Sequence, residues 1–259
     1  MGLLDGKKGL VFGVANDRSI AWYIAKHLID AGATCAFTHL PGEKMERRVR
    51  RTIEAGGVAE PWLVECDASK DEDLDRTFDA IKRDFDSIDF LVHSIAFADR
   101  EYLKIGNFTE TPRSVFGVAL DISAYTLVAM AKRAAVIMPN GGSIIAMSYY
   151  GAEKVVPGYN VMGVAKAALE ACTRYLSFEL GEKGIRVNTI SAGPLKTLSS
   201  MAVDGIDDMF SHVERKAPLR RNVEGDDVGR TGIYLVSDLS SGVTGENIYV
   251  DAGYNVVGL

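Results

Sequence analysis

The sequence predicts an α/β fold: one Rossmann-like doubly wound sheet of about seven parallel strands, with helices on both faces. Short apolar runs alternate with segments of helical periodicity from end to end, and such alternation requires parallel strands joined by right-handed crossovers. A chain of 259 residues also buries enough surface to hold one large core. Because neither a linker nor an internal repeat divides it, residues 1–259 are expected to form a single dinucleotide-binding and catalytic domain.

In the first half of the chain, predicted strands alternate with predicted helices. Apolar runs predict strands at 9–13, 34–38, 62–64 and 88–92. Between the first two, apolar residues recur at the spacing of a helix that lies on a sheet; they are Ala21, Ile24, Ala25 and Leu28. The basic cluster at 43–51 has interleaved acids and reads as a solvated helix face. Leu74, Phe78, Ile81 and Phe85 mark a further helix.

The second half continues the pattern with longer helices. A helical stretch is expected from about 114 to 138, followed by a Pro-Asn-Gly-Gly turn and a strand at 143–147. Pro157-Gly158 should begin a helix that runs to about Gly181. Strands at 186–190 and 247–250 complete a count of roughly seven strands and six main helices.

Residues 194–218 have no strand pattern and are long for a loop, which favours a functional insertion. From 195 to about 212 this segment is apolar enough to cover an apolar ligand, so we expect a substrate-covering lid. The alternative is a helix pair packed permanently on the core. The apolar residues concerned are Leu198, Met201, Val203, Ile206, Met209 and Phe210.

Composition excludes several classes of function. A net charge of −6 disfavours nucleic acid as a partner. Three cysteines without a C-x-x-C spacing, and four histidines without a ligand spacing, predict a reducing compartment and no metal. No signal segment and no run of about 18 apolar residues occurs, so we expect a cytoplasmic protein without a membrane partner.

The turn after the first strand is the first candidate cofactor site. Gly13 is its only glycine, so the G-x-G-x-x-G fingerprint is missing. Gly13 would let a pyrophosphate approach the backbone, while Ser19 and the amide of Ile20 at the helix start meet its charge. The alternative is an ordinary turn.

Later strand ends add weaker signals. Asp67 can accept from the amine of adenine or can cap the following helix, and the small residues of 92–98 would let backbone lie against a ribose. The acid that usually selects the ribose 2′-hydroxyl is absent until Glu43. Because Arg47 and Arg48 follow, NADP is not excluded.

Tyr159 and Lys166 form the candidate catalytic pair. They are seven residues apart on the expected helix, so both project from nearly one face with roughly 10.5 Å of rise between them. A buried ammonium near the phenol would favour the electron-rich forms of its oxygen. The alternative is a packed ring and a surface charge.

Taken together, the motifs resemble the short-chain dehydrogenase/reductase superfamily, and within it the bacterial NADH-dependent enoyl-[acyl-carrier-protein] reductases of type II fatty-acid synthesis. Carbonyl-reducing members have Y-x-x-x-K, whereas Met162 stands four residues before Lys166 here. The matching stretches are G-V-A-N-D-R-S-I-A at 13–21, C-D at 66–67, V-H-S-I-A-F-A at 92–98, M-S-Y at 147–149, Y-N-V-M-G-V-A-K at 159–166, R-V-N-T-I-S-A-G-P at 186–194 and D-V-G at 227–229.

The resemblance implies reduction of the trans-2 double bond of enoyl thioesters on acyl carrier protein, with hydride from NADH. Tyr159 would hydrogen-bond the thioester carbonyl, Lys166 would hold the nicotinamide ribose, and Tyr149 would assist in the acyl site. A dehydrogenase of another carbonyl or alcohol, and a catalytically silent nucleotide sensor, are the alternatives; Met162 argues against the first, and the presence of both Tyr159 and Lys166 against the second.

The resemblance also implies the remaining contacts and a homotetramer. Ala98 is expected near the acyl chain. Two departures matter: Leu40 stands where a glutamine commonly lines the adenosine ribose, and Ala96 where many members have glycine. The expected cofactor contacts are Gly13, Ser19, Ile20, Leu40, Asp67, Ala68, Ile95, Lys166, Leu195, Lys196, Thr197, Leu198 and Ser199.

Overall fold

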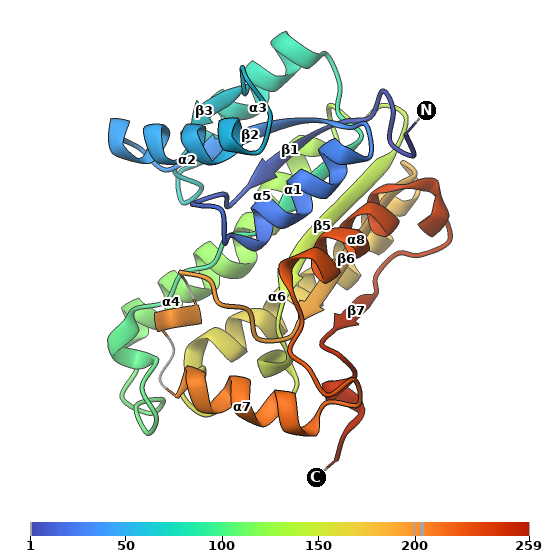
Figure 1. Cartoon of the computed structure of the whole chain (residues 1–259). Coiled ribbons are helices and arrows are strands. Elements are labelled where there is room, and N and C mark those ends of the chain that lie inside the picture. Colours follow the sequence, from blue (N-terminus) through green and yellow to red (C-terminus); the bar gives the residue numbers. More distant parts are fainter. Residues whose placement is uncertain (1, 199, 203–204, 259) are drawn as a thin grey trace.

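A computed structural model describes residues 2–198, 200–202 and 205–258 (Figure 1). One sheet runs through them, with seven parallel strands in the order β3-β2-β1-β4-β5-β6-β7. The reversal of strand order between β1 and β4 is where a doubly wound sheet binds ligands. This topology confirms the fold class. The strands are β1 (Lys8–Phe12), β2 (Thr34–His39), β3 (Leu63–Glu65), β4 (Phe90–His93), β5 (Gly142–Ser148), β6 (Ile185–Ala192) and β7 (Asn247–Val250).

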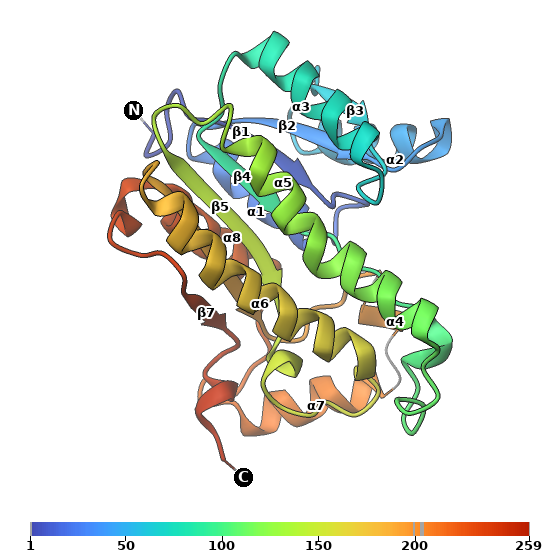
Figure 2. The same cartoon turned by 180° about the vertical axis from the view of Figure 1, so that it is seen from behind.

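Helices cover both faces of the sheet (Figures 1 and 2). One face packs against α1 (Ile20–Asp30), α2 (Glu43–Ala55) and α8 (Gly225–Val236). The other packs against α3 (Asp71–Phe85), α5 (Thr126–Ala134) and α6 (Asn160–Gly181). Beyond the carboxyl end of the strands lies α7 (Ile206–Lys216), which has a small apolar cluster of its own.

The pattern of buried residues explains the layers. The four apolar positions expected on α1 are all fully buried. Helix α8 approaches α1 closely because Gly229 leaves room for His27, to which an added Cβ would come within 2.1 Å. The helix α8 was not among the expected helices, and α7 was expected only in the alternative interpretation of 195–212 as a packed helix pair.

Two expected helices differ from the structure. The stretch expected at 114–138 is α4 (Arg113–Leu120) followed by α5, and the two join through a π-helical turn, Asp121–Tyr125. Inside that turn the fully buried hydroxyl of Ser123 accepts from the Phe97 amide at 3.0 Å. The second difference concerns α6, which begins at Asn160 rather than near Gly158.

The continuous helix Arg113–Ala134 is apolar and long enough to cross a membrane by composition alone. In this fold it packs lengthwise against α6 and meets α3 at its end (Figure 2). Some of its apolar side chains therefore pack against other helices, and the others are exposed on the surface.

Candidate active site

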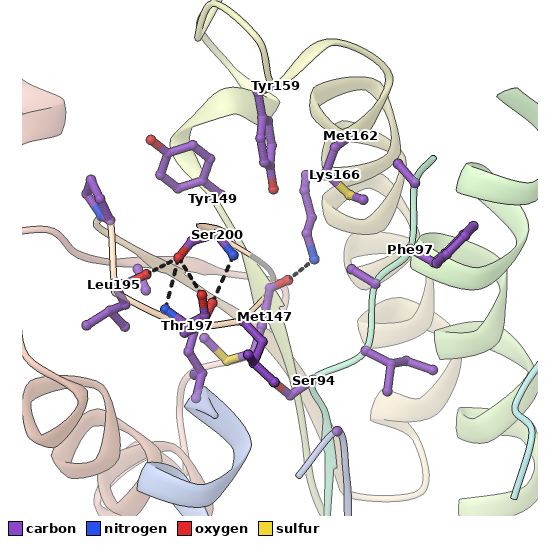
Figure 3. Close-up of a pocket in the computed structure, with 18 of the residues that line it drawn as sticks. Ser94, Phe97, Met147, Tyr149, Tyr159, Met162, Lys166, Leu195, Thr197 and Ser200 are labelled. Atoms are coloured by element: carbon purple, nitrogen blue, oxygen red, sulfur yellow. Dashed lines mark hydrogen bonds between the residues drawn. The ribbon is translucent and has the colours of Figure 1, made fainter. Parts of the chain in front are cut away.

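A cavity of about 740 Å³ opens at the carboxyl edge of the sheet, within the range typical of ligand sites. Its walls come from the ends of β1, β4, β5 and β6, from α6, and from the start of α7 (Figure 3). The expected site residues that it brings together are Gly13, Ser19, Ile20, Ile95, Ala98, Tyr149, Tyr159, Lys166, Leu195, Thr197 and Leu198.

Asn160 positions Tyr159, and sequence reasoning missed it. The Asn160 backbone is left-handed, with φ of 43°, a conformation that asparagine tolerates better than most residues. Its side-chain amide donates to the carbonyls of Tyr102 and Lys104, each at 2.8 Å. Tyr159 is therefore held in the turn before α6 and not on a helical face. The asparagine directly after the tyrosine was the available signal.

The two tyrosine rings of the site meet edge to face. Tyr149 and Tyr159 have ring centroids 4.9 Å apart at 70°, and Figure 3 shows the Tyr159 hydroxyl directed into the cavity. Burial, reinforced by Tyr149, raises the pKa of the Tyr159 phenol above its ordinary value. The expectation that the Lys166 ammonium makes the Tyr159 phenol electron-rich is thus wrong for this structure. Burial keeps the Tyr159 hydroxyl protonated, so it can act as a hydrogen-bond donor.

The Tyr149 hydroxyl points away from Tyr159 in Figure 3. It donates to the sulfur of Met209 on α7 at 2.8 Å. Tyr149 is thus in contact with the segment expected to cover the substrate, and its hydroxyl is engaged there.

Lys166 is buried, with 6% of its surface exposed. Its Nζ donates to the carbonyl of Met147 at 2.6 Å. Burial lowers the pKa of the ammonium to about 8, and Glu170, one turn further along α6, opposes that shift. The interpretation of Lys166 as a surface charge is therefore wrong.

A buried polar network behind Lys166 was not anticipated. The Ser148 hydroxyl donates to the Glu170 carboxylate, and the Asn247 amide donates to the same oxygen at 3.2 Å. Burial is the main cause that raises the pKa of Glu170. Its spacing of four residues from Lys166 on one helix was the available signal.

The turn after β1 is crowded where the pocket begins. A Cβ on Gly13 would lie 2.0 Å from the Ser94 carbonyl oxygen, and the φ of Gly13 is 104°. The Ser19 hydroxyl accepts from the amides of Ala15 and Asn16 at 2.9 and 3.0 Å. These bonds fix the turn before α1, and Ser19 and Ile20 at the helix start line the cavity, the position at which helices commonly bind anions.

The segment after β6 closes into a compact turn. The Ser200 hydroxyl donates to the Leu195 carbonyl at 2.6 Å and accepts from the Thr197 amide at 2.9 Å. Lys196 lies apart from the other expected contacts, along a second cavity and 5.4 Å from the centre of the Phe210 ring. The expected contact Ser199, and Val203 of the proposed lid, lie outside the described residues.

Besides Lys196, three expected contacts do not line the first cavity. Leu40 is 61% exposed at the end of β2, and Asp67 and Ala68 follow β3 further along the same edge. The Asp67 carboxylate accepts from the Ser69 hydroxyl at 2.7 Å and pairs with Lys70 at 3.2 Å. Asp67 therefore stabilises the turn before α3. This role resembles the alternative interpretation of Asp67, in which it caps that helix.

In the described part of the chain no group of three or more His, Cys, Asp or Glu side chains is arranged to hold a metal ion. His93 is fully buried and bonds to Thr126 at 2.8 Å. Burial lowers its pKa to about 3, so the imidazole is neutral.

Comparison with known proteins gives one consistent family. A family model described as enoyl-(acyl carrier protein) reductase matches residues 13–255. The chain is 50% identical, over 99% of both chains, to the enoyl-[acyl-carrier-protein] reductase [NADH] FabI of a Nostoc species. It is 48% identical to the protein of that name from Bacillus cereus, over 100% of both chains.

Solved structures agree. The Bacillus cereus enoyl-acyl carrier protein reductase, crystallised with NADP⁺ and an indole naphthyridinone, has a TM-score of 0.97 at 48% identity and covers 100% of both chains. The reductase from Anaplasma phagocytophilum in complex with NAD has a TM-score of 0.93 at 46% identity, over 100% of this chain and 95% of that one.

Proposed function

The chain belongs to the enoyl-(acyl-carrier-protein) reductase family, and from that membership we propose that the cavity around Tyr159 and Lys166 is its active site. The enzyme reduces the trans-2 double bond of enoyl thioesters carried by acyl carrier protein, in fatty-acid elongation, with NADH as the reductant. The observation that carries the site assignment is the Tyr159 hydroxyl directed into the cavity that also holds the buried Lys166.

Tyr159 is the residue that we assign to the substrate. When bound, the coenzyme supplies a hydride to the β-carbon, which moves negative charge onto the thioester carbonyl oxygen. A phenol held as a donor stabilises that oxygen more strongly in the transition state than in the ground state. The contacts of Asn160 keep Tyr159 in the required position, and edge-to-face packing against Tyr149 limits rotation of its ring.

Lys166 is assigned to the nicotinamide ribose, whose hydroxyls accept hydrogen bonds from an ammonium. The Met147 carbonyl already fixes one of its three donors, and Glu170 favours its charged form. Ser148, which also lines the cavity, links Glu170 to the pocket wall.

The described residues fit a dinucleotide along the carboxyl edge. Gly13 has no side chain where the backbones of β1 and β4 converge, and the start of α1 presents amides to a pyrophosphate. Ala98 in the cavity wall is assigned to the acyl chain. The proposed coenzyme contacts remain Gly13, Ser19, Ile20, Leu40, Asp67, Ala68, Ile95, Lys166 and the segment 195–199.

Loss of dihydronicotinamide absorbance with a crotonyl thioester tests the function. We expect NADH to be consumed only when the enoyl thioester is present. A saturated butyryl thioester is the matched control. Consumption with acetoacetyl thioester but not with crotonyl thioester would instead indicate the alternative, a dehydrogenase acting on another carbonyl.

We further infer that the segment from 195 to about 212 covers the substrate. Met209 and Ile206 of α7 line the cavity, and the Tyr149 hydroxyl donates to the Met209 sulfur. Amide hydrogen exchange at 206–212 is expected to slow when coenzyme and a non-reactive acyl thioester are bound together. Equal exchange in the free and ternary states would favour permanent packing.

A homotetramer is proposed because two helices expose large apolar side chains on the outer side of the fold. On α6, Tyr175 and Phe178 are 80% and 89% exposed, and Tyr125 and Val118 are exposed on the neighbouring helix. Such a surface is typical of a subunit interface. Light scattering at micromolar concentration is expected to give about four times the chain mass of 28.0 kDa, and a monomer would contradict the proposal.

A single domain and a cytoplasmic location complete the proposal. One sheet connects the described residues from β1 to β7. The thiols of Cys35, Cys66 and Cys172 are all free, as suits a reducing compartment.

A further inference from the structure

A carboxylate from β3 occupies the start of α2, next to the end of β2. The Gly42 amide donates to Glu65 Oε2 at 3.0 Å. Glu65 is the last residue of β3 and lies beside His39, the last residue of β2, in parallel register. The φ of Gly42 is 108°, a conformation that favours glycine and lets the loop turn its amide toward β3.

This is the edge at which dinucleotide folds distinguish NADH from NADPH. An acid at the end of β2 commonly bonds the ribose 2′-hydroxyl, and a nearby arginine accommodates a 2′-phosphate. The corresponding stretch here has no acid: His39 is buried and its ring bonds to the Leu40 carbonyl, and Leu40 is exposed and uncharged. The strand β2 itself therefore provides no selecting group.

The family fold does not exclude a 2′-phosphate by its shape. The Bacillus cereus relative, whose backbone is nearly superimposable, was crystallised with NADP⁺. Selection against the phosphate in this chain must then come from its own side chains.

The charges around the start of α2 identify the candidate. Arg47 and Arg50 pair with acids of their own helix, Glu43 at 3.8 Å and Glu46 at 2.8 Å. Lys44 and Arg48 have no such pair among the ion pairs of the described residues, and with the helix dipole they would attract a phosphate. The Glu65 carboxylate opposes that attraction.

We propose that Glu65 sets the preference for NADH: its carboxylate takes the Gly42 amide that a 2′-phosphate would use, repels that phosphate, and accepts from the ribose 2′-hydroxyl. The proposal rests on the proposed function only in requiring a nicotinamide dinucleotide along the carboxyl edge. A residue of β3 thereby performs the task that an acid on β2 performs in other dinucleotide-binding sheets.

Coenzyme binding to the full chain, without enoyl substrate, tests the assignment. The enhanced fluorescence of bound dihydronicotinamide gives Kd for NADH and for NADPH. Glu65→Gln retains an acceptor for Gly42 but removes the charge, and Glu65→Ala removes both. Glu60→Gln, an exposed acid before the opposite end of β3, makes the same change in net charge and is the matched control.

Glu65→Gln and Glu65→Ala are each expected to lower Kd for NADPH by about tenfold, because each removes the solvent-screened repulsion between the carboxylate and the 2′-phosphate. Kd for NADH should rise or stay constant, and Glu60→Gln should change neither. The gain for NADPH should shrink as salt is raised.

An unchanged ratio of the two Kd values in both Glu65 variants, or an equal shift in Glu60→Gln, would overturn the assignment. Failure of the unmodified chain to bind either coenzyme would instead contradict the proposed function. The two failures are therefore distinguishable.

Discussion

Tyr159→Phe is expected to lower kcat by about 10²- to 10³-fold, while Kd for NADH remains nearly unchanged. Removing one donor to a developing oxyanion typically costs about 2.7 to 4 kcal/mol of transition-state stabilisation. Phenylalanine keeps the ring that packs against Tyr149, so the loss reports the hydroxyl alone. Steady-state rates with a crotonyl thioester and coenzyme titration by fluorescence measure the two effects separately.

Tyr150→Phe is the matched control for this substitution. The Tyr150 hydroxyl donates to the Asn255 carbonyl at 3.4 Å and does not line the cavity. We expect the control variant to retain its turnover. Full turnover of Tyr159→Phe would mean that Tyr159 serves only in packing.

Lys166→Met is expected to weaken NADH binding by roughly 10- to 100-fold. A hydrogen bond from a charged donor is worth about 1.5 to 3 kcal/mol, and methionine fills the buried space that the lysine stem occupies. Lys154→Met, at an exposed lysine, is the control. If Lys166→Met bound NADH as tightly as the unmodified chain, the ribose assignment would be wrong.

The same lysine gives NADH binding a pH dependence of known sign. Burial lowers the pKa of Lys166 to about 8, so the ammonium is present below that pH and is lost above it. Kd for NADH should therefore rise between pH 7 and pH 9 in the unmodified chain. Because methionine does not titrate, the Lys166→Met variant should lack this rise.

Local sequence patterns predicted the sheet and part of the site. Buried parallel strands leave continuous apolar runs, and a helix on a sheet leaves a stripe, so β1 and α1 were both found. Tyr159 and Lys166 line one cavity, as their spacing predicted, but Tyr159 precedes α6 and does not lie on it. The roles assigned to Leu40 and Asp67 stay predictions.

What the sequence did not show depends on contacts between distant segments. The start of α6 is set by the bonds of Asn160 to carbonyls more than fifty residues earlier, which no local pattern records. The protonated state of Tyr159 follows from burial and not from the neighbouring ammonium. Glu65 escaped notice because its partner Gly42 lies on another element.

The π-helical turn at 121–125 determines which insertions and deletions this helix tolerates. An α-helix turns by about 100° per residue, and the wider turn absorbs one extra residue while the apolar face of α5 stays on the sheet. Loss of one residue here would rotate α5 against the core or withdraw Ser123 from Phe97. A deletion within the turn must therefore be compensated by an insertion nearby in the same helix, because the residues of α5 that face the core are buried.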